Sequence, residues 1–298
     1  MAESKSGERK IMKIKDYFKK AQKEKWAIGQ FNISNFETLK AIIQAAQNLK
    51  SPVIIGTSEN ESRFIGLKQT VFLVRAFQEE SRLPIFLNLD HGKTFEYIKK
   101  AVEAGYHNIH FDGSGLPFKK NLAMTKKIAK YCHQRKILIE GEIDFIKGCS
   151  EILKKGPKIK EEDLTKPDDA LKFIKETKVD SLAVNIGTFH GMEADGKNPG
   201  IYLQRLREIK EKVQTEAFLV LHGGSGTPKE DIKKATGLGI VKININTELR
   251  AAYTNALKKA LKEKPREIIP YKYLPEAVLA IQQIVEEKIK LFGSRNRI

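Results

Sequence analysis

Short apolar runs alternate along the chain with stretches in which apolar residues recur every three or four positions. A short apolar run is typical of a strand buried on both faces, and the wider spacing is typical of a helix with one buried face. The runs predict strands at 27–32, 52–56, 85–89, 108–111, 137–143, 181–187, 218–221 and 240–245. The wider spacing predicts helices at 11–23, 35–48, 71–77, 95–104, 118–133, 167–175, 202–213, 228–236, 247–262 and 274–291.

The order of these elements indicates the fold class. Eight strands alternate with helices without a linker or a change in composition, which predicts an α/β protein built as a single (β/α)8 TIM barrel with extra N- and C-terminal helices. A doubly wound sheet is the alternative, but it explains fewer polar residues at strand ends. We expect a flexible N-terminus at 1–10 and the barrel domain at 11–298. Residues 144–164 are rich in Lys, Gly and Pro and predict an irregular loop, of the kind that forms a lid or is disordered.

Composition limits the compartment and the partners. Hydrophobic residues make up 41% of the 298 residues and charged residues 31%, as in an ordinary globular protein. No apolar run approaches the roughly 20 residues that cross a bilayer, and the N-terminus lacks the apolar core of a signal peptide. Cys132 and Cys149 are too few for a disulfide framework. We therefore expect a cytoplasmic protein with reduced thiols and no membrane partner.

The formal net charge of +17 raises the alternative of a nucleic-acid-binding protein. Its distribution argues against this, because the lysines are scattered over the predicted helices among glutamates, with no interleaved aromatic residues. We therefore expect no nucleic-acid partner. The basic surface is expected instead to attract anionic substrates.

Three of the six histidines precede a glycine at the end of a strand-like run. These are His91, His190 and His222. Strand ends meet at one rim of a barrel, so the three imidazoles predict a divalent metal site there, with zinc as the first choice. The other three histidines lack this context, and we interpret them as structural or surface residues: His107, His110 and His133.

A glycine-rich turn follows the third of these histidines, at 223–226. Thr227, Pro228 and Glu230 then predict the start of a helix, as N-cap, first-turn proline and capping acid. Backbone N–H groups at such a turn favour a phosphate, although a tight turn without a ligand gives the same pattern. Asn244, Asn246 and Thr247 end the next strand, so the two strands together predict a phosphate site.

Further polar residues end other predicted strands. Asn32, Ser58 and Asp112 do so, and Asp90 precedes a proposed metal ligand, where it suits an acid/base or a support for the metal. Glu140 and Glu142 share one face of their strand, and we expect one or both to point into the barrel. Together these groups predict metal-assisted carbon–carbon or proton-transfer chemistry on a phosphorylated carbonyl compound.

Six segments, in this order, resemble the class II, zinc-dependent fructose-bisphosphate and tagatose-bisphosphate aldolase family. The resemblance runs from about residue 11 to 294. The segments are 30–35 (QFNISN), 89–91 (LDH), 112–118 (DGSGLPF), 179–184 (VDSLAV), 186–191 (IGTFHG) and 221–226 (LHGGSG).

The resemblance implies a role for each matching residue. His91, His190 and His222 are implied as zinc ligands, with Glu142 as an alternative contact or a ligand of a second divalent ion, and Asp90 as the acid/base. The residues implied around dihydroxyacetone phosphate and the rim are Gly191, Gly223, Ser225, Asn246 and Thr247 at the phosphate, Asn244 at the reacting portion, and Asn32 and Ser58 near the substrate. A monovalent cation, Na+ or K+, and a homodimer or homotetramer are also implied.

The lid region departs from the family pattern. Family members carry a lid glutamate that removes a proton from the donor ketone, but the aligned residue here is Ser150, and Glu151 follows it. Our hypothesis is that Glu151 takes the role of this base. Residues 192–194 replace a tyrosine and a lysine that some members place near the phosphate, and Lys197 is the candidate to compensate.

The leading functional reading is a class II aldolase of glycolysis and gluconeogenesis. It cleaves a ketose 1,6-bisphosphate, with fructose 1,6-bisphosphate as the first choice, to dihydroxyacetone phosphate and glyceraldehyde 3-phosphate, and it also catalyses the reverse reaction. Tagatose bisphosphate or another phosphorylated ketose is an alternative substrate. A different class of function is a barrel that lost the lid base and only binds a sugar phosphate.

Overall fold

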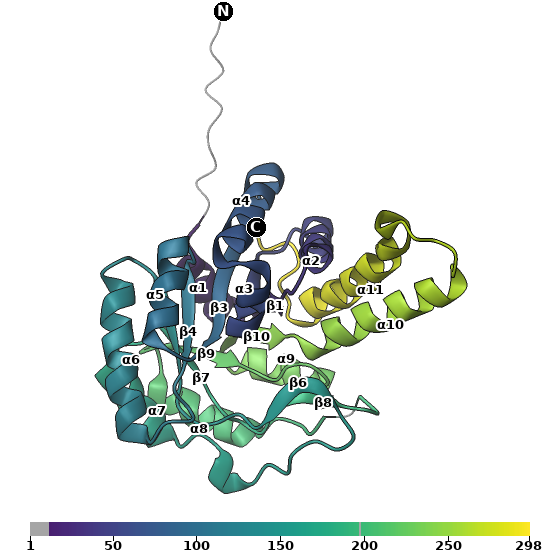
Figure 1. Cartoon of the computed structure of the whole chain (residues 1–298). Helices are drawn as coiled ribbons and strands as arrows, with labels where there is room; N and C mark the ends of the chain where they lie inside the picture. The colour runs from purple at the N-terminus through teal and green to yellow at the C-terminus, as the bar shows by residue number, and fades with distance from the viewer. Residues whose placement is uncertain (1–11, 197) are drawn as a thin grey trace, which may run out of the picture.

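The barrel is the central feature of the computed structural model, which describes residues 12–196 and 198–298. Its strands are β1 (Ile28–Asn32), β2 (Val53–Ser58), β3 (Ile85–Gly92), β4 (Asn108–Asp112), β5 (Leu138–Glu142), β7 (Ser181–Ala183), β9 (Phe218–Leu221) and β10 (Ile240–Ile245). All neighbouring strands are parallel, and they close in the order β1-β10-β9-β7-β5-β4-β3-β2 (Figure 1). The predicted (β/α)8 barrel is confirmed. The predicted flexible segment at 1–10 lies outside the described residues.

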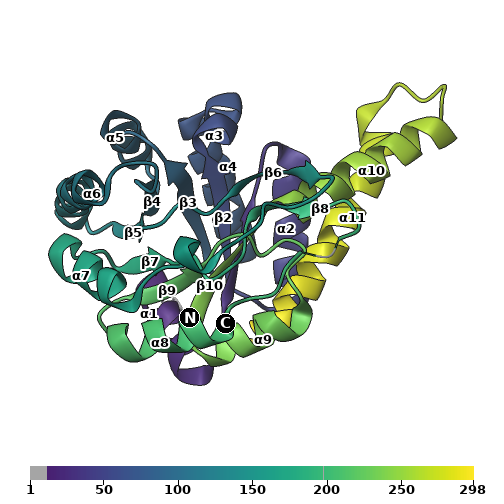
Figure 2. The ribbon, with the colours of Figure 1, turned by 90° about the horizontal axis from the view of Figure 1, so that it is seen from below.

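Helices surround the strands, close to the predicted ranges. They are α2 (Phe36–Leu49), α3 (Glu59–Ile65), α4 (Leu67–Ser81), α5 (Phe95–Ala104), α6 (Phe118–His133), α7 (Pro167–Thr177), α8 (Leu203–Val213), α9 (Lys229–Gly237), α10 (Thr247–Glu263) and α11 (Pro270–Leu291). Helices α10 and α11 pack against each other and extend to one side of the barrel as an arm (Figures 1 and 2). Across the described residues, no helix combines the length and the apolar composition needed to cross a membrane.

Helix α1 (Ile14–Glu24) closes the amino-terminal end of the barrel. In this helix, the ring of Tyr17 packs edge-on against that of Phe86, with centroids 5.7 Å apart. The ring of Phe18 packs in the same way against that of Phe218, with centroids 5.4 Å apart. Both partners lie at or next to the beginnings of their strands. The helix therefore covers this end of the barrel with apolar contacts.

The barrel interior is polar, because alternate residues of several strands carry polar side chains and these point inward. The amide of Asn88 donates to that of Gln30 at 2.9 Å, and Lys242 donates to Glu140 at 2.7 Å. Each of these buried polar groups therefore has a partner, which limits the cost of burial. The next inward positions toward the strand ends are Asn32, Asp90, Glu142 and Asn244, which lie near the open rim.

A second, two-stranded sheet corrects two sequence predictions. Residues 144–164 are not irregular throughout, because β6 (Gly148–Leu153) forms within them and pairs in parallel with β8 (His190–Glu193). The sixth barrel strand ends at Ala183, so His190 does not end a barrel strand but begins β8. The sheet contacts α10 and is seen beside it in Figure 2.

The predicted helix start at 227–230 is also wrong in detail. Helix α9 begins at Lys229, and its N-cap residue is Pro228, without a side-chain cap. The hydroxyl of Thr227 instead donates to the carbonyl oxygen of Gly223 at 2.9 Å. Thr227 therefore braces the glycine-rich turn rather than the helix.

Candidate active site

A cavity of about 230 Å³ opens between the carboxyl ends of the barrel strands and the small sheet. It brings together most of the residues that the sequence predicts for the site. Those that line it are Asn32, Ser58, Asp90, His91, His190, Gly191, His222, Gly223, Ser225, Asn244, Asn246 and Thr247. Two residues that the sequence also predicts, Glu142 and Glu151, are not among the described residues that line it.

The three predicted histidine ligands share one arrangement. In each ring, one nitrogen lies within hydrogen-bond distance of an oxygen acceptor, which favours the tautomer with the proton on that nitrogen. Contacts of this kind orient and polarise metal-binding imidazoles. The pairs are His91 Nδ1 with Asp112 Oδ2 (2.8 Å), His190 Nδ1 with the carbonyl oxygen of Ile146 (3.1 Å) and His222 Nε2 with Glu140 Oε1 (2.8 Å).

The rings lie close enough for a common ligand. The centroid of His91 is 4.7 Å from that of His190 and 5.0 Å from that of His222, and the last two are 5.8 Å apart. His190 Nε2 and Glu142 Oε2 are buried without a hydrogen-bond partner among the described residues. Unsatisfied buried nitrogen and oxygen atoms beside imidazoles are the donor set that a divalent cation uses, so the residues fit such an ion.

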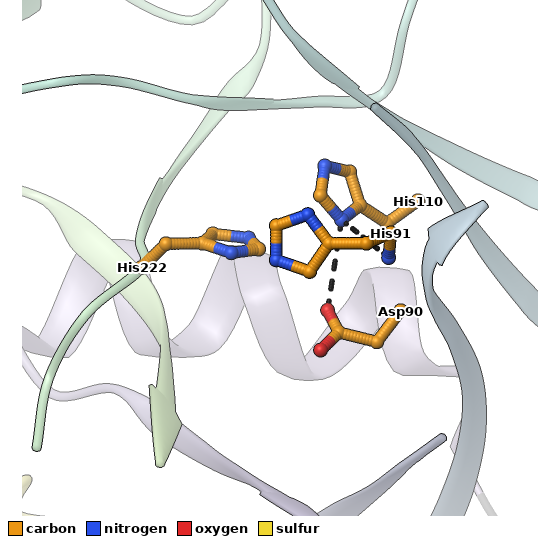
Figure 3. A group of neighbouring side chains, drawn as sticks. All are labelled: Asp90, His91, His110 and His222. Atoms are coloured by element: carbon orange, nitrogen blue, oxygen red, sulfur yellow. Dashed lines mark hydrogen bonds and ion pairs between the residues drawn. The ribbon is translucent and has the colours of Figure 1, made fainter. Parts of the chain in front are cut away.

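Two further groupings share His91. Asp90, His91, His110 and His222 offer ligand atoms that all lie within 4.8 Å of one another (Figure 3). His91, Asp112 and Glu142 do so as well. His190 belongs to neither of these groups in the part of the chain that the structure describes.

His110, interpreted from the sequence as a structural or surface residue, lies beside the site. It is fully buried beside the site, with its ring 4.6 Å from His91 and 4.7 Å from His222. The sequence carries a signal for this position, because Asn108, His110 and Asp112 alternate with apolar residues on one strand and so share a face. His133, in contrast, is partly exposed and contacts Asp180 at 2.9 Å, as expected of a surface residue.

Asp90 is held in place by two amides. Its carboxylate accepts hydrogen bonds from Asn32 at 2.9 Å and from Asn244 at 3.1 Å. Burial raises the pKa of this carboxyl, but the nearby imidazoles of His91 and His110 outweigh burial and hold the pKa well below its ordinary value. The lowered pKa keeps Asp90 in its carboxylate form.

The pKa values of two imidazoles, His190 and His110, are shifted in opposite directions by their surroundings. Burial, followed by the charge of His91, lowers the pKa of His190 to about 3, which keeps this ring neutral. Burial also lowers the pKa of His110, but Asp90 and Glu142 outweigh it and raise the value to about 10. A neutral imidazole such as His190 is the form that binds a metal.

The side of the cavity where the sequence predicts a phosphate requires two glycines. Gly223 has a φ of +68°, and a Cβ there would lie 2.3 Å from the carbonyl oxygen of Phe189. Gly191 has a φ of +118°, and its Cβ would lie 2.6 Å from the carbonyl oxygen of Cys149. Thr247 is the first residue of α10, so the amino terminus of this 17-residue helix faces the cavity. The helix terminus favours an anion there.

A network that the sequence does not predict ties the rim to the small sheet. Glu61 is 5% exposed and accepts a hydrogen bond from Asn32 at 3.0 Å. Arg250 donates to Glu61 at 2.5 Å and to the carbonyl oxygen of Ser150 on β6 at 3.1 Å. Arg250 thus connects α10, α3 and β6.

The remaining predicted residues lie in distinct places. Glu142 is 1% exposed and its Oε2 is 3.7 Å from His91 Nδ1. On β6, Ser150 lines the cavity, whereas Glu151 is exposed on the adjoining position. Lys197 lies outside the described residues.

Comparisons with known proteins identify the family of the chain. Residues 12–297 match the model of the family "Fructose-bisphosphate aldolase class-II". The chain is 36% identical over 291 residues to a Bacillus subtilis (strain 168) protein named "Probable fructose-bisphosphate aldolase", covering 96% of this chain and 99% of that protein. It also resembles the crystal structure of the YdjI aldolase from Escherichia coli K12, with a TM-score of 0.81, 31% identity, and coverage of 96% and 98%.

A third comparison bears on the fold alone. The fructose-bisphosphate aldolase of Campylobacter jejuni superposes with a TM-score of 0.78 at 18% identity, covering 96% of this chain and 95% of that one. The family match over nearly the whole chain is the stronger finding. This chain belongs to the class II fructose-bisphosphate aldolase family.

Proposed function

We propose that the protein catalyses the metal-dependent, reversible aldol cleavage of a ketose 1,6-bisphosphate, with fructose 1,6-bisphosphate as the first candidate. The products are dihydroxyacetone phosphate and glyceraldehyde 3-phosphate. The observation that carries the proposal is the set of three imidazoles that line the cavity, each with one nitrogen in contact with an oxygen, beside the Asp90 carboxylate.

The residues proposed to hold the metal are His91, His190 and His222, with Glu142 as an alternative contact or a ligand of a second ion. Zinc is the first candidate because neutral imidazoles suit it. When bound, the ion supplies Lewis-acid polarisation of the substrate carbonyl. Asp112 orients the ring of His91, and Glu140 orients the ring of His222.

Asp90 is proposed to move the proton on the substrate hydroxyl. In the cleavage direction, its carboxylate takes the proton from the C4 hydroxyl while the C3–C4 bond breaks and the electron pair moves toward the C2 carbonyl. In the reverse direction, Asp90 returns the proton to the new C4 hydroxyl. Asn32 and Asn244 fix the carboxylate through two hydrogen bonds, so its proton-accepting oxygen is positioned before the substrate arrives.

Glu151 is proposed as the base that exchanges the proton at C3 of the donor ketone. Its carboxylate is exposed on β6, outside the cavity, so the role requires this lid strand to move when substrate binds. If Glu151→Gln still exchanges the donor proton of dihydroxyacetone phosphate with solvent at the wild-type rate, Glu151 is not this base.

The phosphate is proposed to bind where the glycine-rich turn meets α10. Gly191, Gly223, Ser225, Asn246 and Thr247 would surround it, with a monovalent cation, Na+ or K+, beside it. The net charge of +17 supports attraction of an anionic substrate. We further propose a homodimer or homotetramer, without a nucleic-acid or membrane partner.

One observation favours a second candidate function. Ser150, and not a carboxylate, faces the cavity from the lid, as expected of a barrel that binds a sugar phosphate without cleaving it. A coupled assay of the cleavage of fructose and tagatose 1,6-bisphosphates separates these functions. Faster turnover of the fructose substrate supports the first proposal, and binding of both sugars without cleavage of either supports the second.

A further inference from the structure

His110 touches the proposed metal centre without belonging to the proposed ligand set. Its side chain is fully buried at the middle of β4. Its Nδ1 accepts a hydrogen bond from the backbone N–H of His91 at 3.1 Å and lies 3.6 Å from Asp90 Oδ1 (Figure 3). Its Nε2 lies 3.2 Å from Glu142 Oε2. One imidazole thus contacts a proposed ligand, the proposed acid/base and the buried glutamate.

The backbone of His91 needs such a partner. His91 has a φ of +49°, in the left-handed region that residues other than glycine rarely occupy. The pairing of β3 with β4 shifts register between Leu89 and Gly92, so the regular ladder is interrupted where His91 lies. The His110 ring accepts a hydrogen bond from the His91 N–H group, which the interrupted ladder leaves without a strand partner. The bulge in turn directs the His91 side chain toward the other imidazoles.

The contact also limits what the His110 ring can offer to an ion. Nδ1 accepts the His91 N–H at 3.1 Å, so its lone pair is already in use. Nε2 lies 3.2 Å from Glu142 Oε2, without a hydrogen bond between the two atoms. The nitrogen that faces His91 and Asp90 is therefore not available to a metal.

We propose that His110 is a positioning residue of the metal centre: it holds the His91 backbone in its left-handed conformation without binding the ion. The inference rests on the metal site of the proposed function. His110 would act through His91, because its ring accepts the His91 N–H and also lies against Glu142.

Two variants separate positioning from ligation. In His110→Asn, the side-chain oxygen can take the place of Nδ1 and accept the His91 N–H, whereas His110→Phe keeps a ring but removes both nitrogens. Metal-free protein of each type would be titrated with Co²⁺ against a chelator, and the visible absorption band and the number of bound imidazoles, from X-ray absorption, would be recorded. We expect His110→Phe to raise the Kd for Co²⁺ about 10- to 100-fold and to shift the band.

We expect His110→Asn to retain the wild-type band, three bound imidazoles, and a Kd within a few-fold of wild type. This result supports the proposal even where His110→Phe does not fold. Loss of one bound imidazole in His110→Asn would make His110 a ligand and overturn the proposal. Wild-type affinity and spectrum in His110→Phe would overturn it as well, whereas failure of the wild type to bind Co²⁺ would overturn the metal centre and the inference together.

Discussion

Glu140 and Lys242 form a buried ion pair inside the barrel, with 2.7 Å between Oε2 and Nζ, and the other oxygen of Glu140 holds His222. The side chains of the pair are 5% and 3% exposed, so neither charge is solvated by water. Replacing one partner leaves the other charge buried and unpaired, which is far more costly than breaking a surface pair.

Lys242→Met should therefore lower the free energy of unfolding by about 3–5 kcal/mol. Denaturant unfolding of the metal-free protein measures this loss. Lys259→Met is the matched control, because Lys259 is exposed and 3.8 Å from its partner Glu263. Its effect should stay within about 0.5 kcal/mol. Equal effects of the two substitutions would show that the buried pair does not stabilise the barrel.

The same carboxylate predicts a pH dependence of stability. Burial raises the pKa of Glu140, but Lys242 and His222 outweigh burial and place the pKa below its ordinary value. The ionised group therefore contributes stability that is complete above the unfolded pKa of about 4.3 and is lost as the pH falls through the lower folded value. In metal-free protein, the difference in unfolding free energy between wild type and Glu140→Gln should shrink below about pH 4.3. A difference that stays constant down to pH 3.5 would argue against this pKa.

Asp90→Asn tests the proposed proton transfer. The amide has nearly the shape of the carboxylate but cannot accept the hydroxyl proton, so we expect kcat for cleavage to fall by about 10²- to 10⁴-fold. Because Asp90 is proposed as a base and not as a ligand, the zinc content should remain that of the wild type. Loss of zinc from this variant, with Asp168→Asn unaffected as an exposed control, would instead identify Asp90 as a metal ligand.

Arg250→Met tests the connection between the barrel and the lid. The substitution removes the hydrogen bonds to Glu61 and to the Ser150 carbonyl oxygen, so β6 should open more often. We expect faster limited proteolysis within residues 148–160 and a higher KM for the bisphosphate. Arg266→Met, on the exposed turn between α10 and α11, should change neither. An unchanged cleavage pattern in Arg250→Met would mean that this arginine does not restrain the lid.

Much of the fold could be predicted because local patterns specify it. Helix α5 begins and ends where the sequence predicts, since Ile98, Ala101 and Val102 recur at helical spacing and a glycine ends the helix. The small sheet could not be predicted in the same way. Strand β6 has little apolar alternation, and its partner β8 lies about 40 residues later, so its pairing depends on tertiary structure.

Local sequence patterns likewise predicted some residues of the site and missed others. Glycine next to histidine marked three imidazoles, and all three line the cavity, although His190 begins β8 instead of ending a barrel strand. The criterion missed His110 because this residue lies within a strand and no glycine follows it. The alternation with Ile109 and Phe111 nevertheless places His110 on the same strand face as Asp112. The sequence analysis missed Glu61 because a capping glutamate in a polar helix start resembles a surface residue. Its partners Arg250 and Asn32 are distant in sequence and meet it only in the folded barrel.

The most direct test of the account measures zinc content and fructose 1,6-bisphosphate cleavage together, before and after treatment with a chelator, in wild type, His222→Ala and His133→Ala. His133 is partly exposed and contacts Asp180 instead of the site, so it controls for the loss of a histidine. We predict cleavage that chelator abolishes and zinc restores in wild type and His133→Ala, with both zinc and cleavage lost in His222→Ala. Undiminished cleavage in zinc-free wild type, or in His222→Ala, would contradict a metal-dependent aldolase.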